Sequence, residues 1–137
     1  MGEPLRIRGH RIRREGDVAV AQIVGTFNRE DAVPFHEFLA AILAAEGRCY
    51  LLADVSAMVK LDTDARRYAA AWNARHRLAG IAVCRAGGAV RAVTMLLVNT
   101  LRMIRRKDAV PLEFLADEAE GRRWIAGLKA AARASGG

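Results

Sequence analysis

The pattern of hydrophobic and polar positions over residues 5–25 predicts a β-hairpin. Leu5 and Ile7 alternate with arginines, which is typical of a half-exposed edge strand. Residues 18–24 are more continuously apolar, so they predict a second strand deeper in the sheet. Between the two, residues 15–17 (Glu-Gly-Asp) predict a tight turn, because glycine adopts positive φ without strain.

After a loop over residues 25–30, the spacing of apolar residues becomes helical. Residues 31–46 predict an amphipathic helix, with Asp31 as its N-cap and Gly47 after its end. The run RCYLLADV then predicts a strand that is buried on both faces and ends at Asp54. We expect a loop over residues 56–61 to follow it.

The second half of the chain repeats this alternation of helices and strands. Asp62-Thr63-Asp64 supplies capping residues for a further helix. The remaining elements are predicted as a strand over residues 81–85, a helix over 89–106, a short strand over 112–115 and a helix over 117–134.

The order β-β-α-β-α-β-α-β-α predicts an α/β fold. Strands separated by helices favour parallel pairing, whereas the short first turn favours an antiparallel pair. We therefore expect a mixed, mostly parallel sheet of about five strands with about four helices. The length of 137 residues fits one domain, 1–137.

Composition adds little about partners. The net charge of +7 raises the question of a nucleic-acid partner. However, the arginines are scattered along the chain rather than clustered, so we do not expect nucleic acid to be the partner. No run approaches the ~20 apolar residues that cross a bilayer, and no secretion signal is visible. The sequence therefore predicts a cytoplasmic protein without a transmembrane segment.

Candidate catalytic chemistry is sparse. Cys49 and Cys84 lie in apolar runs, without a partner at metal or redox spacing, and are expected to be buried reduced thiols. His10, His36 and His76 fall in three different predicted elements, and His36 is expected on a solvent-facing side of its helix. No metal site, cofactor site or catalytic site is predicted, so we do not expect an enzyme.

The helix predicted over residues 89–106 is more apolar than a surface helix requires. Its apolar surface extends beyond an ordinary stripe at Met95, Leu96, Val98 and Met103, and basic residues follow at 102 and 105–107. Three explanations remain open: the helix is sandwiched within the fold, it forms a homodimer interface, or it faces an apolar, lipid-like ligand or an anionic membrane.

Three segments resemble the STAS domain family, in its SpoIIAA-like (STAS/SEC14-like) branch. The segment YLLADVSAMVKLDTDARRYAAAW looks like a strand, loop and helix of that branch, and PLEFLADEAEGRRWIAGL looks like its ending. IAVCRAGGAVRAVTMLL is similar to the segment between them. The resemblance covers nearly the whole chain, although the motifs are patterns rather than invariant signatures.

The resemblance implies a position for a regulatory phosphate. In STAS anti-sigma-factor antagonists, a kinase phosphorylates a serine at the start of this helix and thereby breaks a partner complex. The matching residue here is Thr63, but Ala65 replaces the usual glycine and Asp64 replaces a small polar residue. The alternative is that Asp62 or Thr63 only caps the helix.

The sequence therefore predicts a non-enzymatic STAS-like protein-interaction module in bacterial signalling. Its partner would be a kinase-like or sigma-regulatory protein. The expected binding surface contains Ser56, Asp62, Asp64, Arg66 and Arg67, with Thr63 as the phosphoacceptor. The alternative function is a carrier or sensor of a small apolar or lipid-like ligand.

Overall fold

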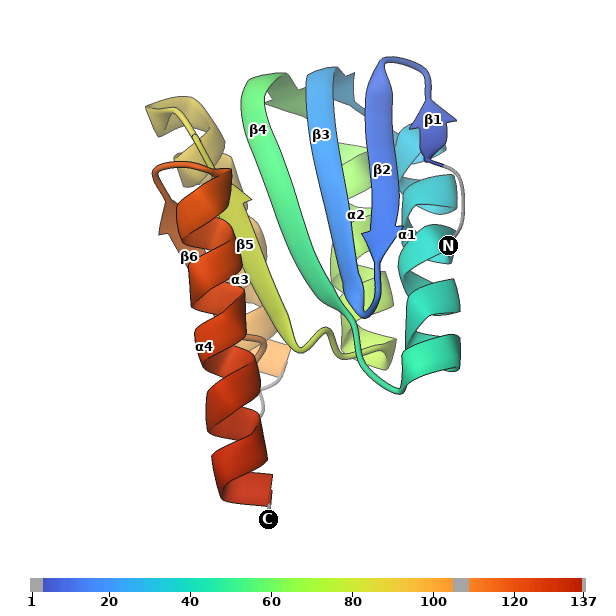
Figure 1. Ribbon diagram of the computed structural model, residues 1–137. Helices are drawn as coiled ribbons and strands as arrows, with labels where there is room; N and C mark the ends of the chain where they lie inside the picture. The colour runs from blue at the N-terminus through green and yellow to red at the C-terminus, as the bar shows by residue number, and fades with distance from the viewer. Residues whose placement is uncertain (1–3, 105–108, 137) are drawn as a thin grey trace.

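The computed structural model describes residues 4–104 and 109–136. Strands and helices alternate along most of the chain, in the order expected for an α/β fold (Figure 1). The elements are β1 (Leu5–Ile7), β2 (His10–Glu15), β3 (Val18–Phe27), α1 (Arg29–Glu46), β4 (Tyr50–Leu61), α2 (Thr63–Arg75), β5 (Gly80–Cys84), α3 (Gly88–Ile104), β6 (Leu112–Leu115) and α4 (Glu118–Gly136).

One mixed sheet organises the fold. Its strands follow the order of the sequence, β1-β2-β3-β4-β5-β6. The first three are antiparallel, and β3 to β6 are parallel. The predicted mostly parallel α/β fold with four helices is confirmed. The sheet has six strands in the described residues instead of five, because a turn at Arg8, with φ of 54°, divides the predicted first strand into β1 and β2.

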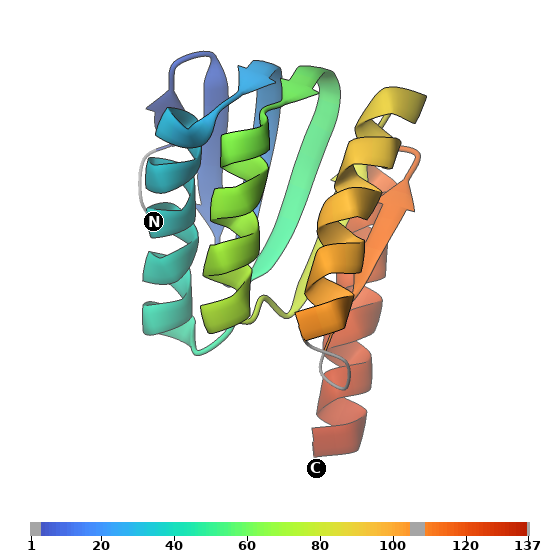
Figure 2. The same cartoon turned by 180° about the vertical axis from the view of Figure 1, so that it is seen from behind.

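The helices cover the two faces of the sheet unequally. Helices α1, α2 and α3 lie on one face of the sheet, behind it in Figure 1 and in front of it in Figure 2, and α4 lies alone on the opposite face, over its β5–β6 side. On that second face, no helix of the described chain lies over β1, β2 and β3 (Figure 1). In the described chain, the β1–β2 side of this face therefore has no helix over it, and Arg6, Arg11 and Arg13 are exposed there.

Two apolar clusters correspond to these two layers. The larger one joins the sheet to α1, α2 and α3, around fully buried side chains such as Ile12, Leu39 and Ile42. The smaller one lies beneath α4 and includes Leu52, Cys84 and Ile125. Both cysteines are buried free thiols, as expected.

The N-cap of helix α1 lies three residues earlier than predicted. Its N-cap is Asn28, whose side chain accepts a hydrogen bond from the Asp31 N–H, while Asp31 accepts from the Asn28 N–H. This reciprocal pair is a capping box, and it satisfies two backbone donors that the first turn leaves open. Asp31 therefore belongs to the first helical turn and is not the N-cap.

Strand β4 is also longer than predicted. Residues 56–61 continue the strand, where the sequence predicted a loop. The strand continues because β3 extends equally far, to Phe27, and pairs with it through Val24 and Ala57 and through Phe27 and Leu61. Two irregularities in the register between β3 and β4 accompany this extension, one of them beside Gly25, whose φ is 72°.

Candidate functional site

The candidate site lies where β4 ends and α2 begins. The Asp62 N–H donates a hydrogen bond to the Phe27 carbonyl oxygen at 2.9 Å, so the end of β3 fixes the start of α2. Asp62 has extended backbone angles, and its carbonyl oxygen accepts from the Arg66 N–H at 2.9 Å. The N-terminus of α2 is therefore held rigidly at the carboxyl end of the parallel strands, the end at which open α/β sheets bind ligands.

The side chain of Asp62 does not cap this helix. Asp62 occupies the N-cap position, but no side-chain hydrogen bond reaches the first-turn N–H groups. Its carboxylate lies 3.8 Å from the Lys60 ammonium instead. Thr63 is the first residue of α2, and it is exposed. The helix start thus presents a hydroxyl beside N–H groups that receive no side-chain cap within the described residues.

The charged residues around Thr63 are nearly balanced. Asp64 and Arg67 are exposed and Arg66 is half-buried. Together with Lys60 and Asp62, they place three cationic and two anionic side chains within residues 60–67. A phosphate added at Thr63 would meet cations on α2 as well as two carboxylates.

Ser56 lies on β4 and not in a loop. Its N–H donates to Asp54 Oδ1 at 2.9 Å, and Arg85 Nη2 donates to Asp54 Oδ2 at 2.7 Å. Partial burial of Asp54 opposes its ionisation, but these hydrogen bonds outweigh the burial and hold its pKa below the ordinary value. A strand advances about 3.3 Å per residue, so Ser56 lies roughly 15 Å before the end of β4 at Leu61. Ser56 and Thr63 are therefore separate parts of the predicted surface.

An exposed apolar residue accompanies this end of the sheet. Val59, on the extension of β4, leaves 77% of its surface accessible. Sequence reasoning missed it because it assigned residues 56–61 to a loop. The only signal in the sequence is that Val59 is an apolar residue within the run predicted as a loop.

Helix α3 buries one side and exposes another. Val98 is buried and Met95 is half-buried, while Leu96 and Met103 are exposed by 54% and 77%. The cavity beside Val98 has a volume of about 20 Å³, which is too small for an acyl chain. The helix is therefore not sandwiched within the described chain. The basic residues predicted at 105–107 lie outside the described residues.

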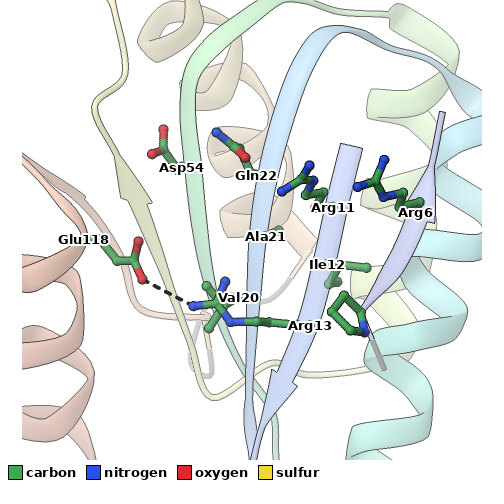
Figure 3. A pocket seen from close by; sticks show the side chains of 10 residues that line it. Arg6, Arg11, Ile12, Arg13, Val20, Ala21, Gln22, Asp54 and Glu118 are labelled. Carbon is green, nitrogen blue, oxygen red and sulfur yellow. Dashed lines mark ion pairs between the residues drawn. The ribbon is translucent and has the colours of Figure 1, made fainter. Parts of the chain in front are cut away.

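A second feature, a hollow on the open face of the sheet, was not predicted. It has a volume of about 560 Å³ and lies between the arginines of β1 and β2 and the start of α4 (Figure 3). Arg6, Arg11 and Arg13 line it, with Gln22 and Glu118 among the other lining residues. The alternation of arginine with Leu or Ile in the first segment is the signal that could have placed these side chains on one face.

His36 is more buried than predicted. His36, expected to face solvent, is 5% exposed and packs between Tyr68 and Trp72 of α2. That expectation was wrong because α2 covers the side of α1 that the isolated helical pattern leaves open. His36 Nδ1 donates to the Ala32 carbonyl oxygen at 2.7 Å, and burial lowers its pKa to about 4. His36 is therefore neutral at pH 7.

His10 is buried beside Asp31. Its Nδ1 accepts a hydrogen bond from the Val24 N–H at 3.0 Å, so the ring proton is on Nε2, which lies 3.2 Å from Asp31 Oδ2. His76 follows the last residue of α2 and stacks on Trp72. The three histidines are thus held by the core or by a helix end and do not converge on one cavity.

The described parts of the chain contain no group of three His, Cys, Asp or Glu side chains that could hold a metal ion. Within residues 4–104 and 109–136, every helix is too short or too polar to span a membrane.

Solved structures place this fold among known ones. The chain resembles a protein of the DUF3478 family from Shewanella loihica PV-4 that has a SpoIIAA-like fold, with a TM-score of 0.57 and 19% identity over 90% of this chain and 98% of that one. It also resembles the anti-sigma factor antagonist SpoIIAA in its unphosphorylated form, with a TM-score of 0.61 and 7% identity over 87% of this chain and 99% of that one. The chain has the SpoIIAA-like fold.

No family model and no curated protein matches this sequence. The two structural likenesses are therefore likenesses of fold. They confirm the SpoIIAA-like fold that the three sequence segments predicted. The roles of individual residues have to be argued from the geometry of this chain.

Proposed function

We propose that this chain is a non-enzymatic, SpoIIAA-like protein-interaction module of bacterial signalling, acting in the cytoplasm. Its binding surface would be formed by the end of β4 and the start of α2, and its partner would be a kinase-like or sigma-regulatory protein. The observation that carries the proposal is the exposed hydroxyl of Thr63, at a helix start without a side-chain cap. The likeness to an anti-sigma factor antagonist supports it at the level of the fold.

The neighbouring residues fit a docking surface. Val59, two residues before the end of β4, supplies exposed apolar area, and Thr63 and Asp64 at the start of α2 supply exposed polar groups. Apolar residues surrounded by polar ones are typical of protein interfaces. The bond between the Asp62 N–H and the Phe27 carbonyl oxygen holds the helix start in place, so binding would not have to order it.

Phosphorylation of Thr63 would change this surface without unfolding it. The free N–H groups and the dipole of α2 favour a phosphate at this position, and Arg66 or Arg67 can pair with it. Asp62 and Asp64 oppose it by about 1 kcal/mol each, since exposed charges interact through water. The helix would therefore remain folded while the charge at the interface changes by about −2.

The test uses the full chain and a partner identified by crosslinking in the native host. Thr63→Glu is expected to weaken binding of that partner at least tenfold and to leave the thermal unfolding temperature unchanged. Thr100→Glu is the matched control, because it makes the same change at an exposed position of α3. Equal affinity of wild type, Thr63→Glu and Val59→Ser would show that the proposed surface is wrong.

Phosphorylation needs its own measurement. Intact-mass analysis of the protein from stressed and unstressed host cells should show a phosphorylated fraction that Thr63→Ala removes. If the wild type carries no phosphate under any condition, the regulatory part of the proposal fails. The partner-binding part would still be decided by the affinity measurement.

A further inference from the structure

The uncovered half of the sheet carries an unusual pairing of like charges. Arg6 and Arg11 are directly opposite each other in the register of β1 and β2. Residues that are directly opposite in an antiparallel pair have Cβ atoms about 4.5–5.5 Å apart, and like charges in such a pair are destabilising. Both arginines are exposed on the same face, and both line the 560 Å³ hollow (Figure 3).

No carboxylate of the described chain neutralises these two arginines. Arg13, two residues further along β2, pairs with Glu15 at 3.0 Å and with Glu118 of α4 at 3.6 Å. Neither Arg6 nor Arg11 has an ion pair or a side-chain hydrogen bond to the described residues. Two guanidinium groups thus share one face without a counter-charge from this part of the chain.

The row of paired residues that begins with Arg6 and Arg11 continues across the sheet to Gln22 and Asp54. Arg11 is directly opposite Gln22, and Gln22 is directly opposite Asp54. The amide of Gln22 can donate to an anion, whereas the carboxylate of Asp54 already accepts from Arg85 at 2.7 Å. The part of the hollow nearest β1 and β2 is therefore electropositive.

Ion pairs connect the start of α4 to the sheet beside the hollow. Arg122 of α4 pairs with Glu118 at 2.7 Å and donates a second bond to Glu15 Oε2 at 3.1 Å. Together with the contact between Arg13 and Glu118, these pairs tie α4 to β2. The volume lies within the range of small-molecule sites, which is about 300–1,000 Å³.

We propose that this hollow binds a small molecule through a phosphate group held between Arg6 and Arg11. A carboxylate has two oxygens in one plane, which one guanidinium fork satisfies. A phosphate has three terminal oxygens in a tetrahedral arrangement, so two forks can donate to it at once. None of the described residues that line the hollow is aromatic, so base stacking would not support a nucleic-acid strand there.

The phosphate group can belong to a soluble phosphorylated metabolite or to a lipid headgroup, and two probes separate these sources. Calorimetric titration of the full chain with glycerol 3-phosphate should show saturable binding if the source is soluble. Cosedimentation with phosphatidylcholine vesicles that contain phosphatidic acid, but not with plain phosphatidylcholine vesicles, would assign the site to a headgroup.

Three variants test the arginines. Arg6→Gln and Arg11→Gln should each weaken binding at least about tenfold, because each removes charged hydrogen bonds to the phosphate. Arg11→Lys keeps the charge but loses the planar fork, and it should also weaken binding. Arg123→Gln is the matched control, because Arg123 is exposed on the side of α4 opposite the buried Gly121 and Ile125. It should bind like the wild type.

The variants also provide a readout of folding. Because Arg6 and Arg11 are exposed and oppose each other, the glutamine variants should unfold at the same temperature as the wild type or higher, most clearly at low salt. Binding to neither probe, or equal affinity in the wild type and the glutamine variants, would overturn the proposal. Tighter binding of an oligoglutamate peptide than of phosphate, with the same dependence on Arg6 and Arg11, would assign the hollow to an acidic protein segment instead.

Discussion

Arg8 donates hydrogen bonds to both carboxylate oxygens of Asp31, from Nε to Oδ1 at 2.7 Å and from Nη2 to Oδ2 at 2.6 Å. Arg8 occupies the turn between β1 and β2, and Asp31 lies in the first turn of α1 with no exposed surface. This pair therefore joins the edge hairpin to the helix layer. It also explains how a fully buried carboxylate is tolerated, since the Asn28 N–H and His10 donate to the same group.

Asp31→Asn should destabilise the protein substantially. The variant removes the negative charge that accepts hydrogen bonds from Arg8 and His10. It also replaces one acceptor oxygen with an amide nitrogen, which is itself a donor and would face the donors of those residues. We expect the free energy of unfolding to fall by about 1–3 kcal/mol, the usual cost of leaving a buried hydrogen-bonding group without its partner, because Asp31 is buried whereas Arg8 is more than half exposed. Urea denaturation measures this change. Asp64→Asn, at an exposed position of α2, should stay within about 0.5 kcal/mol of the wild type.

The same carboxylate makes the fold sensitive to strong acid. Burial opposes ionisation of Asp31, but hydrogen bonds from Arg8, Asn28 and His10 outweigh it and lower its pKa to about 2. A carboxyl with a lowered pKa stabilises the folded state above its unfolded pKa, which is about 3.9. That stability is lost as the pH falls from about 4 to 2, and it amounts to about 2 kcal/mol. Asp31→Asn should flatten the stability profile in this window.

His36 should add a second acid-sensitive range at higher pH. Burial lowers its pKa to about 4, whereas an unfolded histidine titrates near 6.5. The unfolded chain therefore binds a proton that the folded chain excludes, and stability falls as the pH drops from about 6.5 to 4. His36→Phe should remove up to about 3 kcal/mol of this pH dependence. If the stability profile of His36→Phe between these pH values matches that of the wild type, the inferred environment of His36 is wrong.

Two glycines of α4 should respond in opposite directions to the same substitution. A Cβ at Gly121 would lie 2.4 Å from Leu52 Cδ1 and 2.9 Å from Cys84 Sγ, so Gly121→Ala should cost about 1–3 kcal/mol through overpacking. Nothing lies within 4 Å of a Cβ at Gly127. Gly127→Ala should therefore stabilise the helix by about 0.5–1 kcal/mol. Thermal unfolding of the two variants tests how closely α4 packs on the sheet.

The two thiols should be unreactive in the folded protein. Burial raises the pKa of Cys49 to about 12 and that of Cys84 to about 11, so little thiolate forms at pH 8. A disulfide reagent that releases a coloured product on reaction with a thiol should detect almost no free thiol in the native protein and both cysteines after denaturation. Rapid labelling of the native protein at either position would contradict the buried placement of that cysteine.

Much of the fold follows from local patterns. The turn at Gly16, the helical spacing of α1 and the alternation of strands with helices depend on neighbours within a few residues, and each was visible before the structure. The end of β4 could not be predicted in this way, because its last residues pair with the end of β3, which is distant in the sequence. The N-cap of α1 was also misplaced, since Asn28 and Asp31 are both good capping residues and only the backbone geometry distinguishes them.

The candidate sites divide in the same way. The sequence predicts Thr63 at a helix start, and it is the first residue of α2 in the structure. That the Asp62 side chain does not cap this helix is known only from the structure. The burial of His36 depends on α2, and the opposition of Arg6 and Arg11 depends on the register of two strands. Neither relationship can be read along a single element.

The sequence by itself determined the class of the fold, the order of its elements and the helix start that carries Thr63, because these depend on short-range periodicity and capping. Only the tertiary structure decided which face of the sheet stays open and which charges meet across strands. It also decided whether a histidine or a carboxylate is buried with partners. Those properties arise when distant segments pack together, so they depend on register and on which helix covers which surface.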